Sequence, residues 1–369
     1  MADAALDAIV DRVRAARADR APLDIRGGAT KSFYGEAPRG APLDMRGLAG
    51  ISSYEPSELV VTARAGTPLA ELEAMLAEKG QCLAFEPPRF ENPTNASVRG
   101  GTVGGMVAAG LAGPARATAG SVRDHVLGAT LLNGRGEVLS FGGQVIKNVA
   151  GYDVSRVLAG SLGILGAICE VSIKVLPRAA ATRTLRFELD EGAALQRTAE
   201  WGGQPLPISA SAWWRGMLVV RLAGADAAVH AARLRLGGEA IEETLAQEFW
   251  TGLRDQTDEF FAAASQAVGG GASLWRLALP QTAAALGLAG DTLVEWGGAQ
   301  RWLVSEAPAR QVRDAAARAG GHATLFRAQD KSAGVFAPLA PPLARIHHEL
   351  KRAFDPEGIF NPGRLYPGL

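Results

Sequence analysis

Residues 100–105 read Gly-Gly-Thr-Val-Gly-Gly, so four glycines fall within six positions. Glycine lets a backbone turn sharply and lets another molecule approach closely, because no Cβ intervenes. The bare N–H groups of such a loop can hold a pyrophosphate. Further small residues follow, up to Val126. We interpret this stretch as the wall against which a dinucleotide lies. The alternative is a glycine-rich turn between two strands, because short glycine motifs also arise by chance.

The composition of the chain favours a globular protein of about two domains, because it has 369 residues. Hydrophobic residues make up 47% and charged residues 21%, which supplies enough apolar material for a sizeable core. The 38 Lys and Arg residues balance the 38 Asp and Glu residues. A net charge of zero disfavours nucleic acid and other polyanions as partners.

Targeting signals and cysteine frameworks are not found. Cys82 and Cys169 each lie beside apolar residues, which is typical of small buried thiols, and they form neither a disulfide framework nor an iron–sulfur ligand run. Residues 4–20 are amphipathic and lack the apolar core of a signal peptide. No run approaches the roughly 20 apolar residues that span a bilayer. We therefore expect a cytoplasmic protein without a transmembrane segment, held at a membrane only through a partner.

The first half of the chain alternates helical and strand patterns. Leu6, Ile9, Val10 and Val13 recur at helical spacing and predict an opening helix. A short apolar segment at residues 22–25 then leads into a second glycine turn at residues 26–31, Arg-Gly-Gly-Ala-Thr-Lys, which offers N–H groups, a hydroxyl and an ammonium to an anion. Residues 126–132 and 137–141, separated by Asn133-Gly134, predict a hairpin.

Residues 178–335 differ in character and predict a second domain. Five strands are expected, at residues 185–189, 217–222, 274–279, 302–305 and 323–326. Helices are expected between them, at residues 225–236 and 310–319, with no strong internal repeat. Strands alternating with helices predict a sheet covered by helices.

Several common nucleotide and hydrolase motifs are missing. The chain has no G-x-G-x-x-G, which excludes the usual Rossmann signature, and no P-loop. It also has no G-x-S-x-G elbow, which weakens a hydrolase interpretation.

Taken together, the glycine turns resemble a known family over essentially the whole chain, namely the FAD-binding domains of the vanillyl-alcohol oxidase type, also called the PCMH type. The landmarks, in order, are Arg26–Lys31, Leu59–Gly66, Gly101–Gly105, Gly120–Val126, Gly163–Ile168 and Phe354–Gly363. The resemblance implies an α+β fold, in which a two-subdomain FAD-binding domain carries an inserted α+β cap. The implied boundaries are residues 1–177 for the FAD-binding domain, 178–335 for the cap, and 336–369 for a segment that returns to the FAD-binding domain.

The resemblance also implies roles for individual residues. The two glycine loops would line the pyrophosphate with backbone donors, and later residues would surround the ribityl and adenine groups. Residues 30–35 offer neither His nor Cys for covalent attachment, so we expect non-covalent FAD. The expected cofactor-binding residues are Arg26, Gly27, Gly28, Ala29, Thr30, Lys31, Pro88, Gly101, Thr102, Val103, Gly104, Gly105, Ala108, Gly120, Ser121, Asp124, Val126, Gly166 and Ile168.

Within that family the details are most similar to the E subunits of glycolate oxidases. The similar segments are Phe85–Pro88, residues 144–153 and the short cap. The resemblance implies an FAD-binding subunit that supports oxidation of glycolate, a D-2-hydroxyacid, to glyoxylate. Its implied partners are a homologous flavin subunit and an iron–sulfur subunit.

One departure from the family bears on catalysis. Two-hydroxyacid dehydrogenases of this family carry paired cap histidines as metal ligands and a Glu-His-Gly motif before the C-terminal helix. Here the cap holds only His230 and His322, and residues 329–332 read Gln-Asp-Lys-Ser, so we expect no metal site and leave the catalytic residues unknown. A self-sufficient dehydrogenase using Lys147, Tyr152 or Asp153 as its base is one alternative. A structural subunit that has lost FAD is the other.

Overall fold

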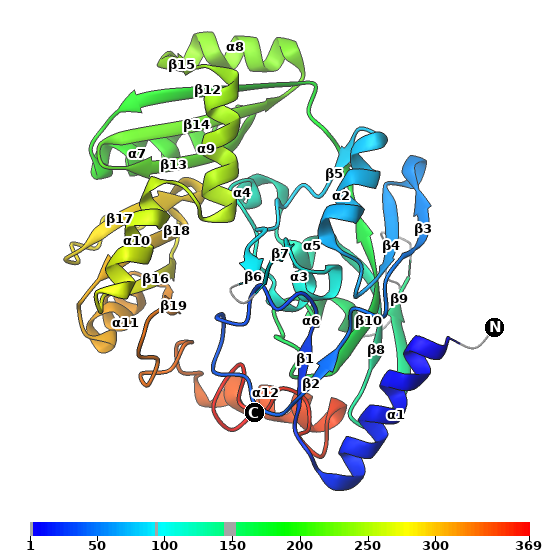
Figure 1. The fold of residues 1–369 in the computed structure, drawn as a ribbon. Helices are drawn as coiled ribbons and strands as arrows, with labels where there is room; N and C mark the ends of the chain where they lie inside the picture. Colours follow the sequence, from blue (N-terminus) through cyan, green and yellow to red (C-terminus); the bar gives the residue numbers. More distant parts are fainter. Residues whose placement is uncertain (1–2, 93–94, 144–152) are drawn as a thin grey trace.

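The computed structural model describes residues 3–92, 95–143 and 153–369, and it arranges them around two large sheets (Figure 1). The N-terminal lobe is built on a five-stranded antiparallel sheet in the order β3-β4-β10-β8-β9. Its strands are β3 (Ile51–Glu55), β4 (Val60–Arg64), β8 (Val126–Leu132), β9 (Val138–Gly142) and β10 (Ala167–Lys174). The predicted hairpin is confirmed as the pair β8 and β9.

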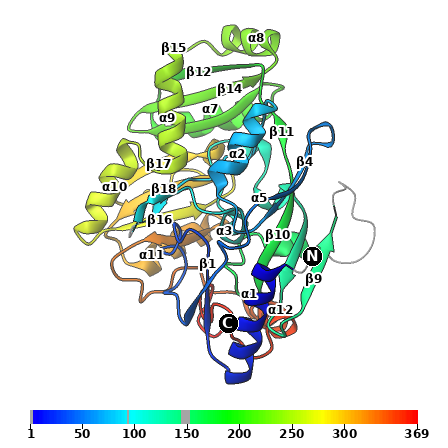
Figure 2. The same cartoon turned by 45° about the vertical axis from the view of Figure 1, so that its right-hand side comes forward.

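Both ends of the chain pack on this lobe. The predicted opening helix is confirmed as α1 (Ala4–Asp19), and it leads into β1 (Leu23–Arg26), which pairs in parallel with β2 (Ala41–Asp44). Helix α12 (Pro341–Phe354) is followed by a tail in which Phe360 bridges back to Leu23. Both views place α1 and α12 at the end of the molecule opposite α8 (Figures 1 and 2).

The core of the lobe forms between the five-stranded sheet and two helices, α2 (Leu69–Glu78) and α3 (Val103–Ala109). Leu72 and Val107 are fully buried there against Val171 of the central strand β10. The remaining elements of the lobe are short: η1 (Pro56–Glu58), β5 (Gln81–Cys82), β6 (Glu91–Asn92), β7 (Asn95–Arg99), α4 (Arg116–Ala119), α5 (Val122–His125), α6 (Val154–Val157) and β11 (Leu176–Pro177).

The cap is an eight-stranded antiparallel sheet in the order β15-β12-β14-β13-β17-β18-β16-β19. Its strands are β12 (Ala181–Glu188), β13 (Ile208–Trp214), β14 (Met217–Gly224), β15 (Glu239–Ile241), β16 (Ser273–Ala278), β17 (Asp291–Glu295), β18 (Gln300–Ser305) and β19 (His322–Arg327). Its helices are α7 (Glu191–Gly202), α8 (Asp226–Leu236), α9 (Glu243–Asp255), α10 (Glu259–Gly269), η2 (Trp296–Gly298) and α11 (Ala309–Arg318).

The cap sheet repeats one topology twice. If each set of four strands is numbered along the chain, β12 to β15 and β16 to β19 both lie in the order 4-1-3-2, and β13 and β17 join the two sets edge to edge. In the first set, α7 follows the first strand and α8 follows the third. In the second set, α11 follows the third strand, but turns at residues 280–290 stand where a helix would follow the first. The sequence showed no strong repeat, since the two sets share strand order rather than residues.

Helices cover both faces of the cap sheet. Helices α7, α8 and α11 pack on one face, through clusters that include Leu218 and Leu303. Helices α9 and α10 pack on the other face, where Val219 points because alternate residues of a strand face opposite sides. That second face also meets Tyr34 and Phe90 of the N-terminal lobe, so it is the face turned toward that lobe.

The predicted cap elements are confirmed in part. The five expected strands fall on β12, β14, β16, β18 and β19, and the two expected helices match α8 and α11. Strands β13, β15 and β17 and helices α7, α9 and α10 were not expected. In the described parts of the chain, no helix combines the length and the apolar character needed to cross a membrane.

Candidate functional site

The two glycine loops of the N-terminal lobe lie directly against each other. A Cβ on Gly27 would lie 2.2 Å from the hydroxyl oxygen of Thr102. A Cβ on Gly101, which has a left-handed φ of 75°, would lie 2.8 Å from the hydroxyl oxygen of Thr30. Both positions therefore favour glycine, because a side chain there would displace the facing threonine or push the two loops apart.

The first loop presents main-chain donors without protein partners. The N–H groups of Gly28, Ala29, Thr30 and Lys31 meet no acceptor in the described part of the chain. Ala29 holds a left-handed φ of 53°, which turns the loop after β1. These residues line a cavity of about 100 Å³, large enough for a small anionic group. Unpaired N–H groups aimed around a hollow form a concave site for anions such as phosphate.

The second loop uses its donors differently from the prediction. The N–H groups of Val103 and Gly104 bond to the main-chain oxygens of Thr67 at 3.0 Å and Ala65 at 2.8 Å. The N–H of Gly105 bonds to the hydroxyl of Thr102 at 3.3 Å, which caps α3. The expectation that these three amides are bare donors is therefore wrong, because two of them join α3 to the segment after β4 and the third caps α3. Gly101, Thr102 and Gly105 still line the cavity.

Lys31 is one of three basic residues that line this cavity, with Arg26 and Arg364. Its ammonium lies 3.5 Å from the hydroxyl oxygen of Thr30 and 5.5 Å from the centre of the Phe90 ring. Burial lowers the pKa of Lys31 to about 8, while the more distant carboxylate of Asp255 raises it slightly. An ammonium that has lost hydration without gaining a close carboxylate is suited to meet an anionic ligand.

The C-terminal tail supplies two residues of the cavity wall that the sequence did not single out. The amide of Asn361 accepts a bond from Ile25 N–H at 2.8 Å and donates to Leu162 O at 2.6 Å. The buried guanidinium of Arg364 donates to Ser32 O at 2.8 Å and also to Glu36 O. Asn361 belongs to the family landmark Phe354–Gly363, which was the signal available, and Arg364 directly follows it.

The cap also contacts the segment that follows the first loop. Lys331 donates to Phe33 O, and the carboxylate of Glu36 accepts from Val335 N–H at 2.6 Å. Arg327 lies with its guanidinium 3.6 Å from the centre of the Phe33 ring. Burial lowers the pKa of Lys331 to about 8 and that of Arg327 to about 10. The first loop is thus held from both the cap and the tail.

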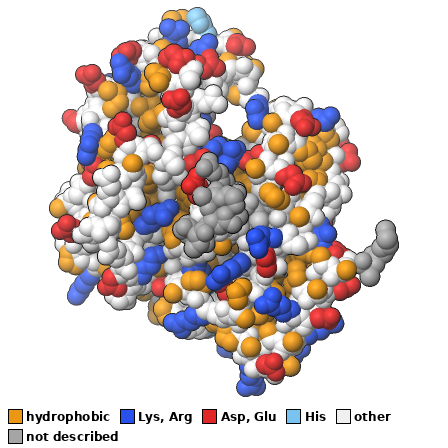
Figure 3. Space-filling view, in the orientation of Figure 1, with side chains coloured by type: hydrophobic (Ala, Val, Ile, Leu, Met, Phe, Trp, Pro, Cys, Tyr) orange, Lys and Arg blue, Asp and Glu red, His pale blue; other side chains and the backbone are white. Residues whose placement is uncertain are grey.

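The cap meets the N-terminal lobe again at Glu86, within the predicted segment Phe85–Pro88. Glu86 adopts an unusual left-handed φ of 49°. Its two carboxylate oxygens meet Arg221 of the cap at 2.8 Å and Ala115 N–H at 2.9 Å. The space-filling view shows Lys and Arg side chains along the boundary between the cap and the N-terminal lobe (Figure 3). The position therefore couples the cap to the chain that leads into α4.

Three predicted site residues form a helix cap beyond the cavity. Asp124 accepts from both the N–H of Ser121, at 2.8 Å, and its hydroxyl, at 2.9 Å, which makes the capping box of α5. These bonds lower the pKa of Asp124, the backbone bond most strongly. A Cβ on Gly120 would lie 3.0 Å from the Asp124 carboxylate. The local role of these residues is structural, and a cofactor contact by them stays a prediction.

The other predicted residues divide between the cavity and the core. Arg26 and Ala108 line the cavity. Val126 and Ile168 have buried side chains in the core of the sheet, and Gly166 leaves no room for a Cβ beside Leu132 O. Pro88 is buried in the segment between β5 and β6. Contact of these residues with the ribityl and adenine groups stays a prediction.

The histidines and the proposed bases have identifiable local roles where they are described. Both ring nitrogens of the buried His125 lie at hydrogen-bond distance from main-chain oxygens, Ala119 O at 2.9 Å and Lys174 O at 3.2 Å, as expected of a packing histidine. Asp153 caps α6 and pairs with Arg156 at 3.0 Å. Lys147 and Tyr152 lie outside the described residues. Across the described residues, no group of three or more His, Cys, Asp or Glu side chains could hold a metal ion.

Comparison with known proteins decides the family. The glycolate oxidase subunit GlcE of Escherichia coli (strain K12) is 47% identical over 362 residues, which are 98% of this chain and 97% of that protein. The chain belongs to the GlcE family of FAD-linked oxidoreductase subunits. A family model described as an FAD binding domain matches residues 4–142, and one described as the C-terminal domain of FAD linked oxidases matches residues 335–365.

More distant relatives agree with this family. The glycolate oxidase subunit GlcD of Bacillus subtilis (strain 168) is 29% identical over 168 residues, 45% of this chain and 34% of that protein. Among solved structures, an alkyldihydroxyacetonephosphate synthase superposes with a TM-score of 0.62 at 15% identity, covering 96% of this chain and 74% of that one. This structural likeness establishes the fold, an FAD-binding domain of the PCMH type with mixed helices and sheets.

The first loop fits the diphosphate of the family's cofactor, FAD. Its partnerless N–H groups from Gly28 to Lys31 and the ammonium of Lys31 are donors and charge of the kind that phosphate oxygens need. The glycine positions at which a Cβ would close the hollow agree with a cofactor that approaches the backbone closely. The chain is an FAD-linked oxidoreductase subunit, and the role of the first-loop amides as its phosphate site stays a prediction.

Proposed function

We propose that this chain is the FAD-binding subunit of a glycolate oxidase complex and supports oxidation of glycolate, a D-2-hydroxyacid, to glyoxylate. The observation that carries the proposal is the 47% identity to a glycolate oxidase GlcE subunit over almost the full length of both chains. Its partners in the proposal are a homologous flavin subunit and an iron–sulfur subunit. We place the complex in the cytoplasm, with any contact to a membrane made through those partners.

The chain's own residues would hold the cofactor without a covalent bond. The amides of Gly28 to Lys31 would donate hydrogen bonds to the diphosphate oxygens, and Lys31 would balance their charge. Asn361 and Arg364, which belong to the C-terminal tail, would fix the conformation of the loop through their hydrogen bonds to Ile25 and Ser32. FAD, when bound, supplies a two-electron acceptor. Neither His nor Cys occurs at residues 30–35, so a covalent link has no attachment point there.

A helper role is favoured over catalysis by this chain alone. The paired cap histidines and the Glu-His-Gly motif of the catalytic relatives are missing from the sequence. At the position of that motif, Gln329 donates to Gly269 O at 2.7 Å and Lys331 donates to Phe33 O. These side chains fasten the cap instead of offering a base to a substrate hydroxyl. In the proposal the chain carries electrons or organises the complex, while the partner flavin subunit oxidises glycolate.

Purification of the chain by itself tests this function. We expect yellow protein with a flavin absorbance spectrum, and release of all the flavin on denaturation in acid. With glycolate or D-lactate it should turn over at a small fraction of the rate of the assembled complex. Rapid turnover by the isolated chain would overturn the helper role.

The two alternatives carry less support. A self-sufficient dehydrogenase needs a base, and of its three candidates the described one, Asp153, is engaged in a helix cap and an ion pair. In a structural subunit without FAD, the amides of Gly28 to Lys31 would gain no ligand to offset the cost of lying unpaired beside a hollow. A colourless protein that still assembles with its partners would favour that second alternative.

A further inference from the structure

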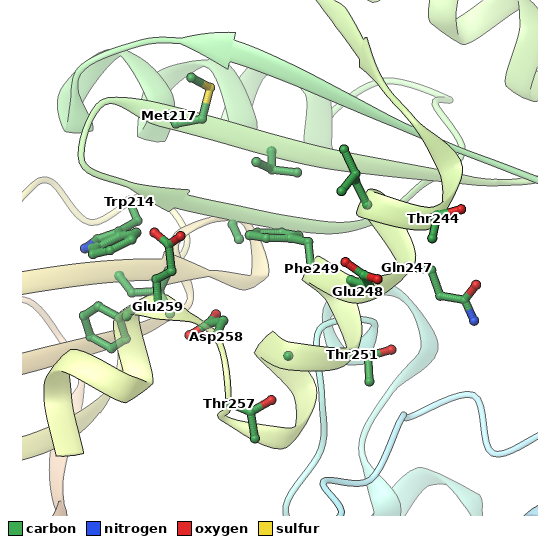
Figure 4. Close-up of a pocket in the computed structure, with 16 residues that line it drawn as sticks. Trp214, Met217, Thr244, Gln247, Glu248, Phe249, Thr251, Thr257, Asp258 and Glu259 are labelled. Carbon is green, nitrogen blue, oxygen red and sulfur yellow. The ribbon is translucent and has the colours of Figure 1, made fainter.

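A large hollow lies on the cap, and its lining shares no residue with the cavity at the first loop. A groove of about 890 Å³ runs between α9, α10 and the sheet (Figure 4). Helix α9 packs over the first set of four strands and α10 over the second, and the groove lies between the two helices. Ala212, Val219 and Leu293 line its floor, but their side chains are buried in the core of the cap. The accessible part of the groove is therefore its rim, which α9 and the start of α10 supply.

Helix α9 carries more apolar surface than the cap can bury. Ala246, Trp250 and Leu253 face the cap and are buried. Leu245 and Phe249, four positions apart, form the edge of the same apolar face, along the groove. Phe249 packs in part against the core of the cap, whereas Leu245 remains 59% exposed. An exposed apolar edge that borders a large hollow indicates an interaction surface.

The charge on the groove has one sign. Glu248, Asp258 and Glu259 are among the sixteen residues that line it, and the lining contains no Lys or Arg. This bias is local, because acidic and basic residues are equal in number over the whole chain. Asp258 is engaged as the N-cap of α10, whereas Glu248 and Glu259 are exposed at the rim. Glycolate, an anion, would be repelled here, so the groove does not suit the substrate of the proposed complex.

We propose that this groove docks a segment of a partner subunit that presents apolar side chains flanked by Lys or Arg. The apolar residues would cover Leu245 and the exposed part of Phe249, and the basic residues would face Glu248 and Glu259. Complementary charge at the rim and apolar contact at the centre are the usual arrangement of a specific interface. The inference rests on the proposed function, since that function supplies the partner subunits.

A charge and packing variant tests the groove within the complex. Leu245→Ala combined with Glu248→Lys should weaken capture of the co-expressed partner flavin and iron–sulfur subunits by about tenfold or more, which corresponds to loss of one anchoring contact. The matched control is Leu234→Ala with Glu188→Lys. Leu234 is 71% exposed on α8, Glu188 is exposed on β12, and neither lines the groove. The control should bind the partners as the unmodified chain does.

The outcomes separate the groove from the proposed function. If the unmodified chain fails to capture either partner, the complex itself is refuted. If the unmodified chain captures them and the groove variant captures them equally well, the groove proposal is overturned. It is also overturned if the variant dissociates a homodimer of this chain, measured by sedimentation, while capture of the partner subunits is unchanged. Equal FAD content in both variants would show that a loss of capture does not come from unfolding.

Discussion

The side-chain oxygen of Asn361 accepts a hydrogen bond from the main-chain N–H of Ile25 at 2.8 Å, across 336 positions of sequence. Ile25 lies in β1, directly before the loop whose amides have no protein partner. The same side chain donates to Leu162 O at 2.6 Å. The buried side-chain amide of Asn361 thus connects the C-terminal tail to the strand before the first glycine loop and to the segment around Leu162.

Replacement of Asn361 by alanine should destabilise the first glycine loop, residues 26–31. The Asn361→Ala variant leaves the buried Ile25 N–H and Leu162 O without partners, which costs about 2 kcal/mol of unfolding free energy. The loss of FAD affinity should accompany the loss of stability, because β1 feeds directly into the loop. Urea unfolding and fluorescence titration with FAD measure the two effects. Unchanged values of both would contradict this role of the tail.

A single methyl group on the first glycine loop should separate it from the second. In Gly27→Ala the new Cβ would lie 2.2 Å from the Thr102 hydroxyl, so the loops must move apart. We expect the Kd for FAD to rise roughly tenfold or more, equivalent to at least about 1.4 kcal/mol. Gly47→Ala is the matched control, because nothing lies within 4 Å of its Cβ. If both variants bind FAD equally, the contact between the loops does not shape the site.

Local patterns in the sequence predicted some of the regular elements. The spacing of Leu6, Ile9, Val10 and Val13 identified α1, and Asn133-Gly134 identified the hairpin of β8 and β9. Helix α9 was missed, although its apolar residues share one face at the spacing of a surface helix.

Hydrogen bonds between residues far apart in the sequence could not be predicted from local motifs, and they determine much of the site. Both glycine loops were visible, but which amides remain free depends on Thr67 and Ala65, which accept from Val103 and Gly104 only in the folded chain. Asn361 likewise joins the site through contacts that no local motif encodes.

The protonation of Lys31 should make FAD binding dependent on pH. Burial lowers the pKa of Lys31 to about 8, so the ammonium that attracts the diphosphate is present below that pH and is lost as the pH rises through it. FAD affinity should therefore fall between pH 7 and pH 9. In Lys31→Met the affinity should be lower at pH 7 and should lose most of this slope. A slope that persists unchanged in Lys31→Met would assign the titration to another group.

The buried carboxyl of Glu295 should make the stability of the chain fall as the pH rises. Burial is the main cause that raises its pKa from 4.5 to about 7, although Trp302 and Gln300 donate to it at 2.6 and 2.9 Å. The folded chain holds this proton more tightly than the unfolded chain, so stability is lost between pH 4.5 and 7, on the order of 3 kcal/mol in total.

The Glu295→Gln variant isolates this effect, because Asp258 and Glu86, which also raise the pKa of Glu295, are kept. Thermal unfolding from pH 5 to pH 8 should show a smaller decrease in Tm for the variant than for the unmodified chain. Parallel curves for the two proteins would mean that Glu295 does not titrate in this range.

Amide hydrogen exchange with and without FAD tests the central claim, that main-chain amides of the first loop hold the diphosphate. We expect FAD to slow exchange at Gly28, Ala29, Thr30 and Lys31 by about tenfold or more, because these N–H groups then gain acceptors. The amides of Val103 and Gly104 should be protected before FAD is added, since they already bond to Thr67 and Ala65. Bound FAD that leaves exchange at residues 28–31 unchanged would contradict the account.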